Sequence, residues 1–411
     1  MISPSKTERR LGRRASFAVA AYAFAVTMLG TTLPTPLYGL YRDEFGFSEL
    51  MITVIFATYA AGVIAALLLL GRLSDEIGRR RVLLPGLAFS ALSAVAFLLA
   101  QGLSPLLVGR ILSGLSAGIF TGTATATLVD LAAPEARGRA TLVATVANMG
   151  GLGCGPLLAG LVSEAGSPLR LPFWVDLALL VPAAVGVWAM HEPVAARRPA
   201  RLRPQALHVP SEVRATFARA ALAGFAGFAV LGLFTAVGPA FLASILGITS
   251  RATIGLVAFS VFAASTAGQL ALERVPGRVA LPAGCALLIA GMGVLVVGLA
   301  ASSLAPLLVG GVIAGFGQGL SFRAGLTALN AESPAERRAE VASSFFVVAY
   351  VAISIPVVGE GVLAEVVGLR TAGLVFAGVV AALSAAVLVL LARSRPAAAV
   401  ARTSSPPRAR A

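Results

Sequence analysis

Three ionisable side chains fall inside long apolar segments, where a charge is costly. Arg110 lies within residues 104–127, Asp176 within 170–190 and Glu360 within 342–366. An Arg in a membrane span costs about 2.5–3.5 kcal/mol on insertion scales, so it normally faces a polar cavity. A carboxyl among apolar side chains suits a carrier that takes up and releases one proton. The alternatives are that Arg110 extends to the lipid headgroups and that the two acids cap helix ends or pair with neighbouring residues.

The composition requires these side chains to be held by membrane helices. Of 411 residues, 58% are apolar and 12% charged, and the mean hydropathy of +0.90 predicts that the solvent is lipid. A helix needs roughly 20 apolar residues to span a bilayer. Runs of that size predict twelve spans in an all-α membrane protein, at residues 16–37, 50–71, 82–101, 104–127, 140–163, 170–190, 217–242, 252–272, 279–301, 304–328, 342–366 and 369–392.

The chain contains an internal duplication. SPLLVGRILSGLSAGI at 104–119 is repeated as APLLVGGVIAGFGQGL at 305–320. Flanking segments repeat in the same order, since PEARGRA from Pro134 is echoed by PAERRAE from Pro334. Two homologous halves are a common plan of secondary carriers. We predict two pseudo-symmetric six-helix bundles with these boundaries: 1–190, a cytoplasmic linker at 191–216, a second bundle at 217–392 and a disordered basic cytoplasmic tail at 393–411.

The arginines predict an orientation, because cytoplasmic loops keep an excess of positive charge near the span ends. One side of the predicted spans carries most of them, and the other side carries Arg42, Arg170, Arg251 and Arg370. Both termini are therefore expected in the cytoplasm, in a multi-pass protein of the plasma membrane. The net charge of +14 is explained by this topology, and a nucleic-acid partner is not expected because the basic tail has no aromatics.

The sequence lacks residues that several classes of enzyme require. The single lysine, Lys6, excludes a GxxxxGK[ST] phosphate loop. The GxSxG run from Gly114 to Gly118 lies inside a predicted span without a nearby His, so it is better explained as a helix-packing face than as a hydrolase elbow. No Cys/His ligand cluster predicts a metal site. We expect no enzyme activity and no cofactor.

A short cytoplasmic loop carries the most specific motif. Residues 71–81 read GRLSDEIGRRR, in which two glycines allow a tight reversal and the arginines hold the loop in the cytoplasm. With this loop, the chain resembles the major facilitator superfamily over essentially its whole length. The resemblance implies that Asp75 stabilises the outward-facing state as part of a conformational latch, with Gly71, Gly78, Arg79 and Arg80. Glu76 departs from the family pattern, which usually has a basic residue there.

Two further motifs fit the same resemblance. Arg110 lies in LxxRxxxG, with Ser113 where the family usually has Gln, and the resemblance implies proton coupling there. Span 5 is close to GxxxGPxxGG, the motif of the family's antiporters, at Gly151, Gly155, Pro156 and Gly160, with Ala159 replacing a glycine. Pure helix packing is the alternative for these small residues.

Six polar residues are candidates for a substrate cavity. Arg323 is the first choice for contact with an anionic or polar substrate, because its repeat equivalent is Gly122 and the scaffold therefore does not require an Arg. The others are Tyr22, Asn148, Gln269, Gln318 and Tyr350.

The leading interpretation is alternating-access export of a small organic or drug-like molecule in exchange for protons. The expected partners are this substrate, protons and the lipid bilayer, and the expected state is a monomer. Proton-coupled uptake or facilitated diffusion of a metabolite is the first alternative. A membrane receptor or assembly protein that transports nothing is the second, although it does not need charges inside its spans.

Overall fold

Twelve helical stretches cross the protein from end to end. The computed structural model describes residues 11–71, 73–194 and 205–393, and this part contains helices and loops but no strand. Each stretch is long and apolar enough to span a membrane, and each predicted range overlaps one of them. Their bounds are Arg13–Phe45, Glu49–Leu70, Arg79–Leu98, Leu103–Leu131, Pro134–Glu164, Leu171–Ala189, Ser211–Ile245, Arg251–Ala271, Gly277–Ala300, Leu304–Glu332, Ala335–Val367 and Leu369–Arg393. The predicted count of twelve is confirmed.

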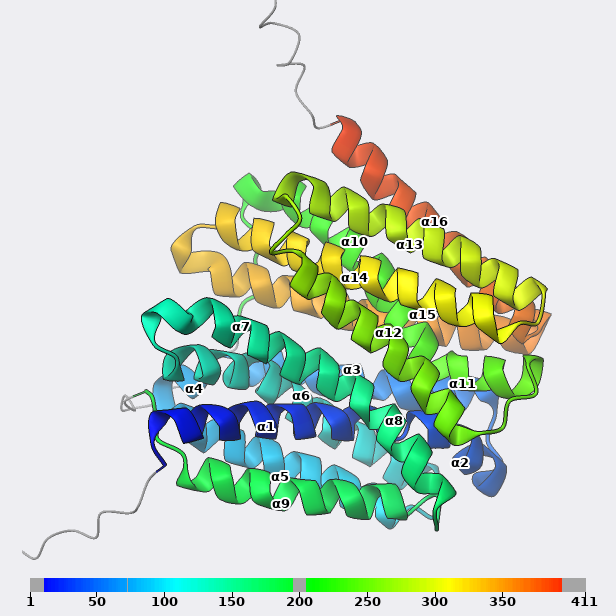
Figure 1. Cartoon of the computed structure of the whole chain (residues 1–411), viewed down its shortest axis with the longest axis horizontal. Coiled ribbons are helices and arrows are strands. Elements are labelled where there is room, and N and C mark those ends of the chain that lie inside the picture. Colours follow the sequence, from blue (N-terminus) through cyan, green and yellow to red (C-terminus); the bar gives the residue numbers. More distant parts are fainter. Residues whose placement is uncertain (1–10, 72, 195–204, 394–411) are drawn as a thin grey trace, which may run out of the picture.

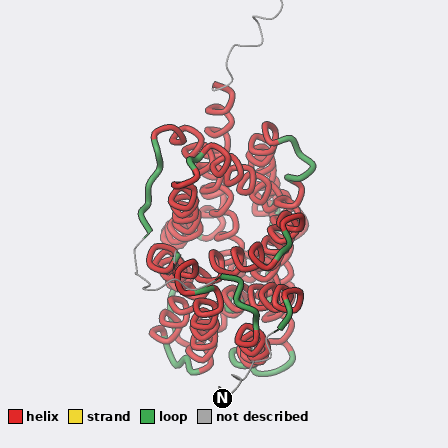
Figure 2. Tube along the Cα trace, turned by 90° about the vertical axis from the view of Figure 1, so that its left-hand side faces the viewer, coloured by secondary structure: helices red, strands yellow, loops and turns green. Residues whose placement is uncertain are grey.

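The helices form two groups that lie against each other (Figures 1 and 2). The first group holds α1 (Arg13–Thr32), α2 (Tyr38–Phe45), α3 (Glu49–Leu70), α4 (Leu73–Ile77), α5 (Arg79–Leu98), α6 (Leu103–Leu131), α7 (Arg137–Thr145), α8 (Gly151–Glu164) and α9 (Leu171–Ala189). The second group holds α10 (Arg214–Gly232), α11 (Gly238–Ala240), α12 (Arg251–Ala271), α13 (Gly277–Ala300), α14 (Leu304–Glu332), α15 (Arg338–Val367) and α16 (Leu369–Arg393). Residues 195–204 of the predicted linker and 394–411 of the predicted tail lie outside the described residues.

Three spans change helix type in their interior. In the first, Pro34 precedes a 3-10 turn, η1 (Thr35–Leu37), because a proline lacks the N–H that an α-helix needs. In the fifth, the π-helical segment η3 (Val146–Gly150) joins α7 to the glycine-rich α8. In the seventh, π-helical segments flank α11 at η5 (Leu233–Val237) and η6 (Phe241–Ile245). Such interruptions relax a helix locally and are frequent at functional sites.

The duplicated glycines perform the same packing task in both halves. Gly114 and Gly118 of α6 lie so close to α3 that a Cβ atom would overlap it. Their repeat equivalents, Gly315 and Gly319 of α14, lie equally close to α12. Ser116, in the middle of the GxSxG run, is buried and donates to the carbonyl of Gly86 at 2.7 Å. The run is therefore a packing face, as the sequence predicts.

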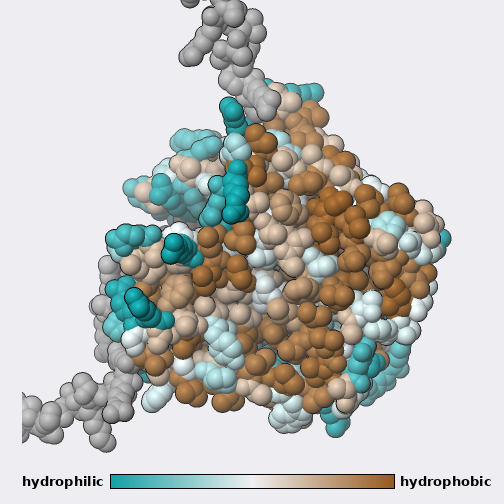
Figure 3. Space-filling view, in the orientation of Figure 1, coloured by the Kyte–Doolittle hydropathy of each residue, from teal (hydrophilic) through white to brown (hydrophobic). Residues whose placement is uncertain are grey.

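The surface is apolar around the middle and hydrophilic at the ends (Figure 3). Exposed apolar side chains such as Val181, halfway along α9, belong to the middle band, where lipid replaces water as the neighbour. One end carries Arg79, Arg137 and Arg338 at helix starts, and we call it the Arg-rich end. The other, where α3, α12 and α16 begin, is called the opposite end.

Candidate functional site

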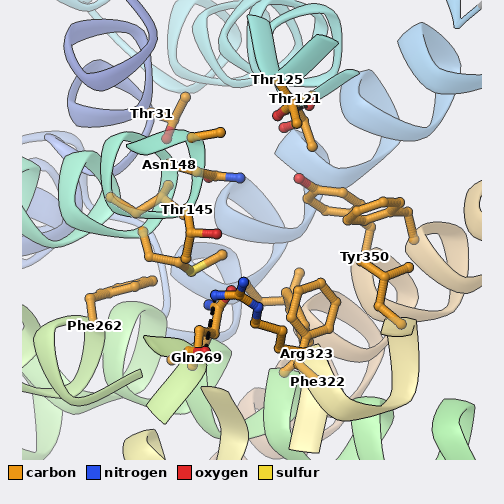
Figure 4. A pocket seen from close by; sticks show the side chains of 18 of the residues that line it. Thr31, Thr121, Thr125, Thr145, Asn148, Phe262, Gln269, Phe322, Arg323 and Tyr350 are labelled. Carbon is orange, nitrogen blue, oxygen red and sulfur yellow. Dashed lines mark hydrogen bonds between the residues drawn. The ribbon is translucent and has the colours of Figure 1, made fainter. Parts of the chain in front are cut away.

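A cavity of about 500 Å³ lies between the two groups of helices (Figure 4). Side chains of α1, α3, α6, α7 and α8 line it from one half, and side chains of α10, α12, α14 and α15 line it from the other. Asn148 and Thr145 point into it from the first half, and Arg323 from the second. Polar side chains are thus supplied by both bundles to one site.

The cavity opens at the Arg-rich end. Thr141, Thr327 and Asn330 line it, are exposed and lie near the Arg-rich ends of α7 and α14. Towards the opposite end the lining residues Thr31, Thr32 and Arg110 are buried. A solute therefore has access from one end only.

Arg110 lies at the closed, deep part of this cavity. It is 2% exposed and comes from the first third of α6. Its guanidinium donates to the carbonyls of Thr31 at 2.5 Å and Phe56 at 3.4 Å. It also lies over the rings of Phe56 and Tyr59, at 5.4 and 4.7 Å from their centroids. These contacts hold the cation inside the protein rather than at the headgroups, and its Nε has no hydrogen-bond partner among the described residues.

The second half contributes one cation and a group of aromatic rings. Arg323 of α14 donates to the backbone carbonyl of Gln269 at 3.1 Å, as the dashed line in Figure 4 marks. Next to it in the chain, Phe322 packs against Phe228 and Phe346, with ring centroids 5.0 and 6.0 Å apart. All three phenylalanines line the cavity. The wall beside Arg323 is therefore apolar and aromatic.

Four of the six cavity candidates line the site and two do not. Arg323, Asn148, Gln269 and Tyr350 belong to the lining. Tyr22 is corrected: it is 37% exposed and donates to the carbonyl of Leu179 at 3.0 Å, on a different face of α1.

Gln318 is the second correction. It is fully buried between α14 and α12, where it accepts a hydrogen bond from Ser265 at 2.5 Å. A polar residue in a span bridges helices as readily as it lines a cavity, and the sequence does not distinguish the two cases.

The two membrane carboxyls lie away from the cavity. Asp176 of α9 is 2% exposed and packs against α1, where a Cβ on Gly30 would be 3.0 Å from its Oδ2. Glu360 of α15 is 3% exposed, and neither of its oxygens has a hydrogen-bond partner among the described residues. Its neighbour Gly361 contacts Thr53 of α3 in the other half. Of the three proton-coupling candidates, Arg110 alone lines the cavity.

The loop after α3 forms a charge cluster at the Arg-rich end. Arg79 is 7% exposed and pairs with Asp75 at 2.5 Å and with Asp130 of α6 at 3.0 Å. The backbone N–H groups of Arg79 and Arg80 donate to Glu192, at 2.8 and 3.0 Å.

Two glycines of the same loop make this geometry possible. Gly78 has φ +101°, a conformation that favours glycine, and a Cβ there would be 2.9 Å from the Glu192 carboxylate. A Cβ on Gly71 would be 2.6 Å from Oε1 of Gln205, whose amide donates to the carbonyl of Ala339 in the second half. The residues predicted to form the latch therefore lie together, and Asp75 pairs with Arg79 next to this loop.

The glycines of span 5 pack α8 against two different helices. Gly151 and Gly155 leave no room for a Cβ against α1. Gly153 faces α12, where a Cβ would be 2.9 Å from the Cβ of Phe262. Gly160 and the carbonyl of Pro156 also lie against α12. The motif thus packs α8 inside its own half and joins it to the other half.

A polar clasp extends this contact at the opposite end. Glu164 at the end of α8 accepts from the hydroxyl of Ser250 at 3.0 Å and from the N–H of Ala252 at 3.1 Å. In return, Arg251 donates to the hydroxyl and carbonyl of Ser163, both at 3.0 Å. The two halves are joined here by the C-terminal end of α8 and the N-terminal end of α12.

Sequence reasoning missed several residues of these sites. Asp130 and Glu192 complete the loop cluster, and Phe56 and Tyr59 hold Arg110. A signal existed for Asp130, because it ends span 4 on the same side as the loop arginines. No sequence pattern marks which aromatic residue of α3 faces α6.

Comparisons with known proteins agree with this architecture. The sequence profile of the Major Facilitator Superfamily matches residues 15–356. The multidrug transporter MdfA of Edwardsiella ictaluri is 30% identical over 278 residues, 66% of this chain and 67% of that protein. The chloramphenicol resistance protein CraA of Acinetobacter baumannii is 26% identical over 327 residues, 74% of this chain and 75% of that protein.

A solved structure shares the fold. It is a bacterial homologue of the human lysosomal transporter Spinster in an inward-facing, unoccupied conformation, with a TM-score of 0.72, 17% identity, and coverage of 96% of this chain and 99% of that one. Three uncharacterized transporters of Schizosaccharomyces pombe match at 25% identity over 43% of this chain, which spans only 36% of their length.

Proposed function

The chain belongs to the major facilitator superfamily, and from this we propose that it exports a small organic or drug-like molecule in exchange for protons. The observation that carries the proposal is a cavity of about 500 Å³ between the two bundles that is open at one end and closed at the other. Such an arrangement is one half of an alternating-access cycle, in which the two bundles rock about a central site. The names of MdfA and CraA support drug export as the direction.

The proposed orientation places the Arg-rich end in the cytoplasm of a plasma-membrane protein, with both termini on that side. The open cavity then faces the cytoplasm, where an exporter must collect its substrate. The clasp of Glu164 with Ser250 and Ala252 closes the external side in this state. The proposed boundaries of the moving parts are residues 1–190 and 217–392, working within one monomer.

The charge cluster at the loop after α3 is proposed to favour the outward-open state. Outward opening brings the Arg-rich ends of the bundles together, where Gln205 already touches both halves through Leu68 and Ala339. Asp75, Arg79 and Asp130 hold the first half's part of that contact in one geometry. We therefore assign these residues to the latch.

Proton coupling is assigned to Arg110 together with one of the two membrane acids. Arg110 lines the cavity, so its contacts change when substrate enters. Glu360 lies next to the contact between α15 and α3, so bundle movement changes its surroundings. Asp176 is held between α9 and α1 within one half.

The test uses everted vesicles with an imposed pH gradient and a pH-sensitive dye, challenged with a panel of antibiotics, dyes and metabolites. Wild type is compared with Arg110→Ala, Asp75→Asn and the surface control Arg370→Ala. A compound that collapses the gradient with wild type and the control, but not with Arg110→Ala, supports exchange. Substrate flux without proton movement overturns proton coupling and favours facilitated diffusion. Absence of flux for every compound contradicts the transport proposal.

A further inference from the structure

The cavity carries positive charge that no side chain of its own wall balances. Among the described lining residues the formally charged ones are Arg110 and Arg323, and none is an Asp or Glu. Neither arginine forms an ion pair with a described residue. The remaining polar lining consists of Thr, Asn, Gln and Tyr side chains, which carry no charge.

These two cations are not needed to build the fold. The internal repeat aligns Arg110 with Gly311 and Arg323 with Gly122. Gly311 packs against Phe234 in the second half, and Gly122 lines the cavity with open space around it. At each of these two positions, one half of the repeat has an arginine and the other half forms the same scaffold with a glycine. A charge that packing does not require, in a place where burying it is costly, is expected to serve a ligand.

The arginines lie at different depths. Arg323 is in the half of α14 nearer the Arg-rich end, where the cavity opens, and it is half-buried. Arg110 lies deeper, with its guanidinium already donating to Thr31 and Phe56. A solute entering from the open end meets Arg323 first. Arg323 makes one hydrogen bond to a described residue, at Gln269, which leaves most of its donors for a ligand.

An apolar wall lies beside this guanidinium. Within the lining, Phe322 makes edge-on ring contacts with Phe228 and Phe346, and Leu326 and Ile353 belong to the same lining. A planar guanidinium pairs well with a carboxylate or sulfonate, and aromatic rings take up the apolar body to which the acid group is attached.

We infer that this cavity selects organic monoanions with an aromatic or other apolar body, whose acid group pairs with Arg323. The inference rests on the proposed function, because it names the substrate class of the same site. Organic cations are disfavoured, since they find no carboxylate and face two positive charges. Arg323 is thus the specificity-determining residue, while Arg110 adds positive potential at the deep end.

The experiment measures equilibrium binding without any gradient. The protein is placed in phosphatidylcholine nanodiscs and dialysed against three radiolabelled probes with one ring system: 2-naphthoate, 2-naphthamide and 2-naphthylmethylammonium. Empty nanodiscs correct for partition into lipid. Wild type is expected to bind the naphthoate about tenfold more tightly than the amide, the effect of one charge-assisted hydrogen bond, and the ammonium most weakly.

Variants assign the selectivity to one side chain. Arg323→Gln is expected to remove the difference between naphthoate and naphthamide, and its retained binding of the amide reports an intact cavity. Arg323→Lys keeps a charge but not the planar fork and is expected to restore part of the difference. Arg370→Gln, at an exposed arginine of the opposite end, is expected to leave all three affinities unchanged.

Two outcomes overturn the inference: equal or tighter binding of the ammonium by wild type, or an unchanged preference for naphthoate in Arg323→Gln. Because binding here needs no proton gradient, it is separate from the proposed exchange. Proton-coupled flux of the ammonium, with no binding of the naphthoate, contradicts the anion class and leaves proton-coupled export standing. Selective naphthoate binding without proton movement supports the anion class and contradicts the coupling.

Discussion

The two ends of the interface between the bundles differ in the groups that form them. At the opposite end α8 meets α12 through glycines, so that Gly160 and Gly255 bring backbone against backbone. At the Arg-rich end the bundles stand apart around a cavity lined by side chains. The closed end is therefore held by close backbone packing together with the polar clasp of Glu164 and Arg251, whereas the open end presents side chains to a solute. A carrier must open the first contact in every cycle, and the hydrogen bonds that Glu164 accepts there are exposed, so these groups can bond to water when the contact separates.

The largest expected effect comes from breaking the shape of the closed end. A Cβ on Gly255 would overlap the carbonyl of Pro156. Gly255→Leu is expected to disfavour the closed contact by about 1–3 kcal/mol, as overpacking does elsewhere. Transport should fall by more than about tenfold for the same reason, and a cysteine introduced at Ile254, in a chain without its native cysteines, should react faster with an impermeant maleimide. Gly293→Leu is the control, since its Cβ meets nothing within 4 Å; equal labelling in both variants contradicts the prediction.

The next effect concerns the chemistry of the open cavity. Arg110→Lys keeps the positive charge but cannot donate to Thr31 and Phe56 while lying flat over Tyr59. Proton-coupled transport is expected to slow by about tenfold, the effect of about one lost charge-assisted hydrogen bond. The measurement is the initial rate in proteoliposomes beside Arg370→Lys. Wild-type rates in Arg110→Lys would show that charge alone suffices.

A smaller effect is expected from the charge cluster of the Arg-rich end. Arg79→Ala removes the partner of Asp75 and Asp130. Because the Asp75 side chain is 61% exposed, water screens that pair, and the expected loss of stability is about 1 kcal/mol. The thermal unfolding midpoint in detergent should fall relative to Arg81→Ala, at an exposed neighbour. Equal unfolding midpoints for Arg79→Ala and Arg81→Ala would contradict the assignment of this cluster to the latch.

The smallest effect is expected at the polar clasp. Glu164→Gln keeps an oxygen that accepts from Ser250 and Ala252 but loses the negative charge at the start of α12. Labelling at the closed end should rise by no more than about twofold and only at low salt, since exposed charges are screened. Glu365→Gln is the matched control, at the exposed repeat equivalent of Glu164. A rise that persists at high salt would contradict an electrostatic cause.

The fold was largely predictable from the sequence, and the sites only in part. Apolar runs long enough to cross a bilayer marked twelve spans, because lipid gives the backbone no partner other than its own helix. The duplicated glycines marked which helix faces pack, since only a small residue allows that approach. Tyr22 and Gln318 were placed wrongly because a polar side chain in a span has the same sequence appearance whether it lines a cavity or bridges two helices.

The sequence by itself determined the membrane class, the repeat and the positions of the buried charges, because each depends on local composition and spacing. The tertiary structure alone decided which charges share a cavity. Arg110 and Arg323 come from different halves and line one space, whereas Asp176 and Glu360 are buried elsewhere. The physical reason is that rotation of each helix about its own axis is set by packing with its neighbours, and that rotation decides whether a side chain meets the cavity, another helix or lipid.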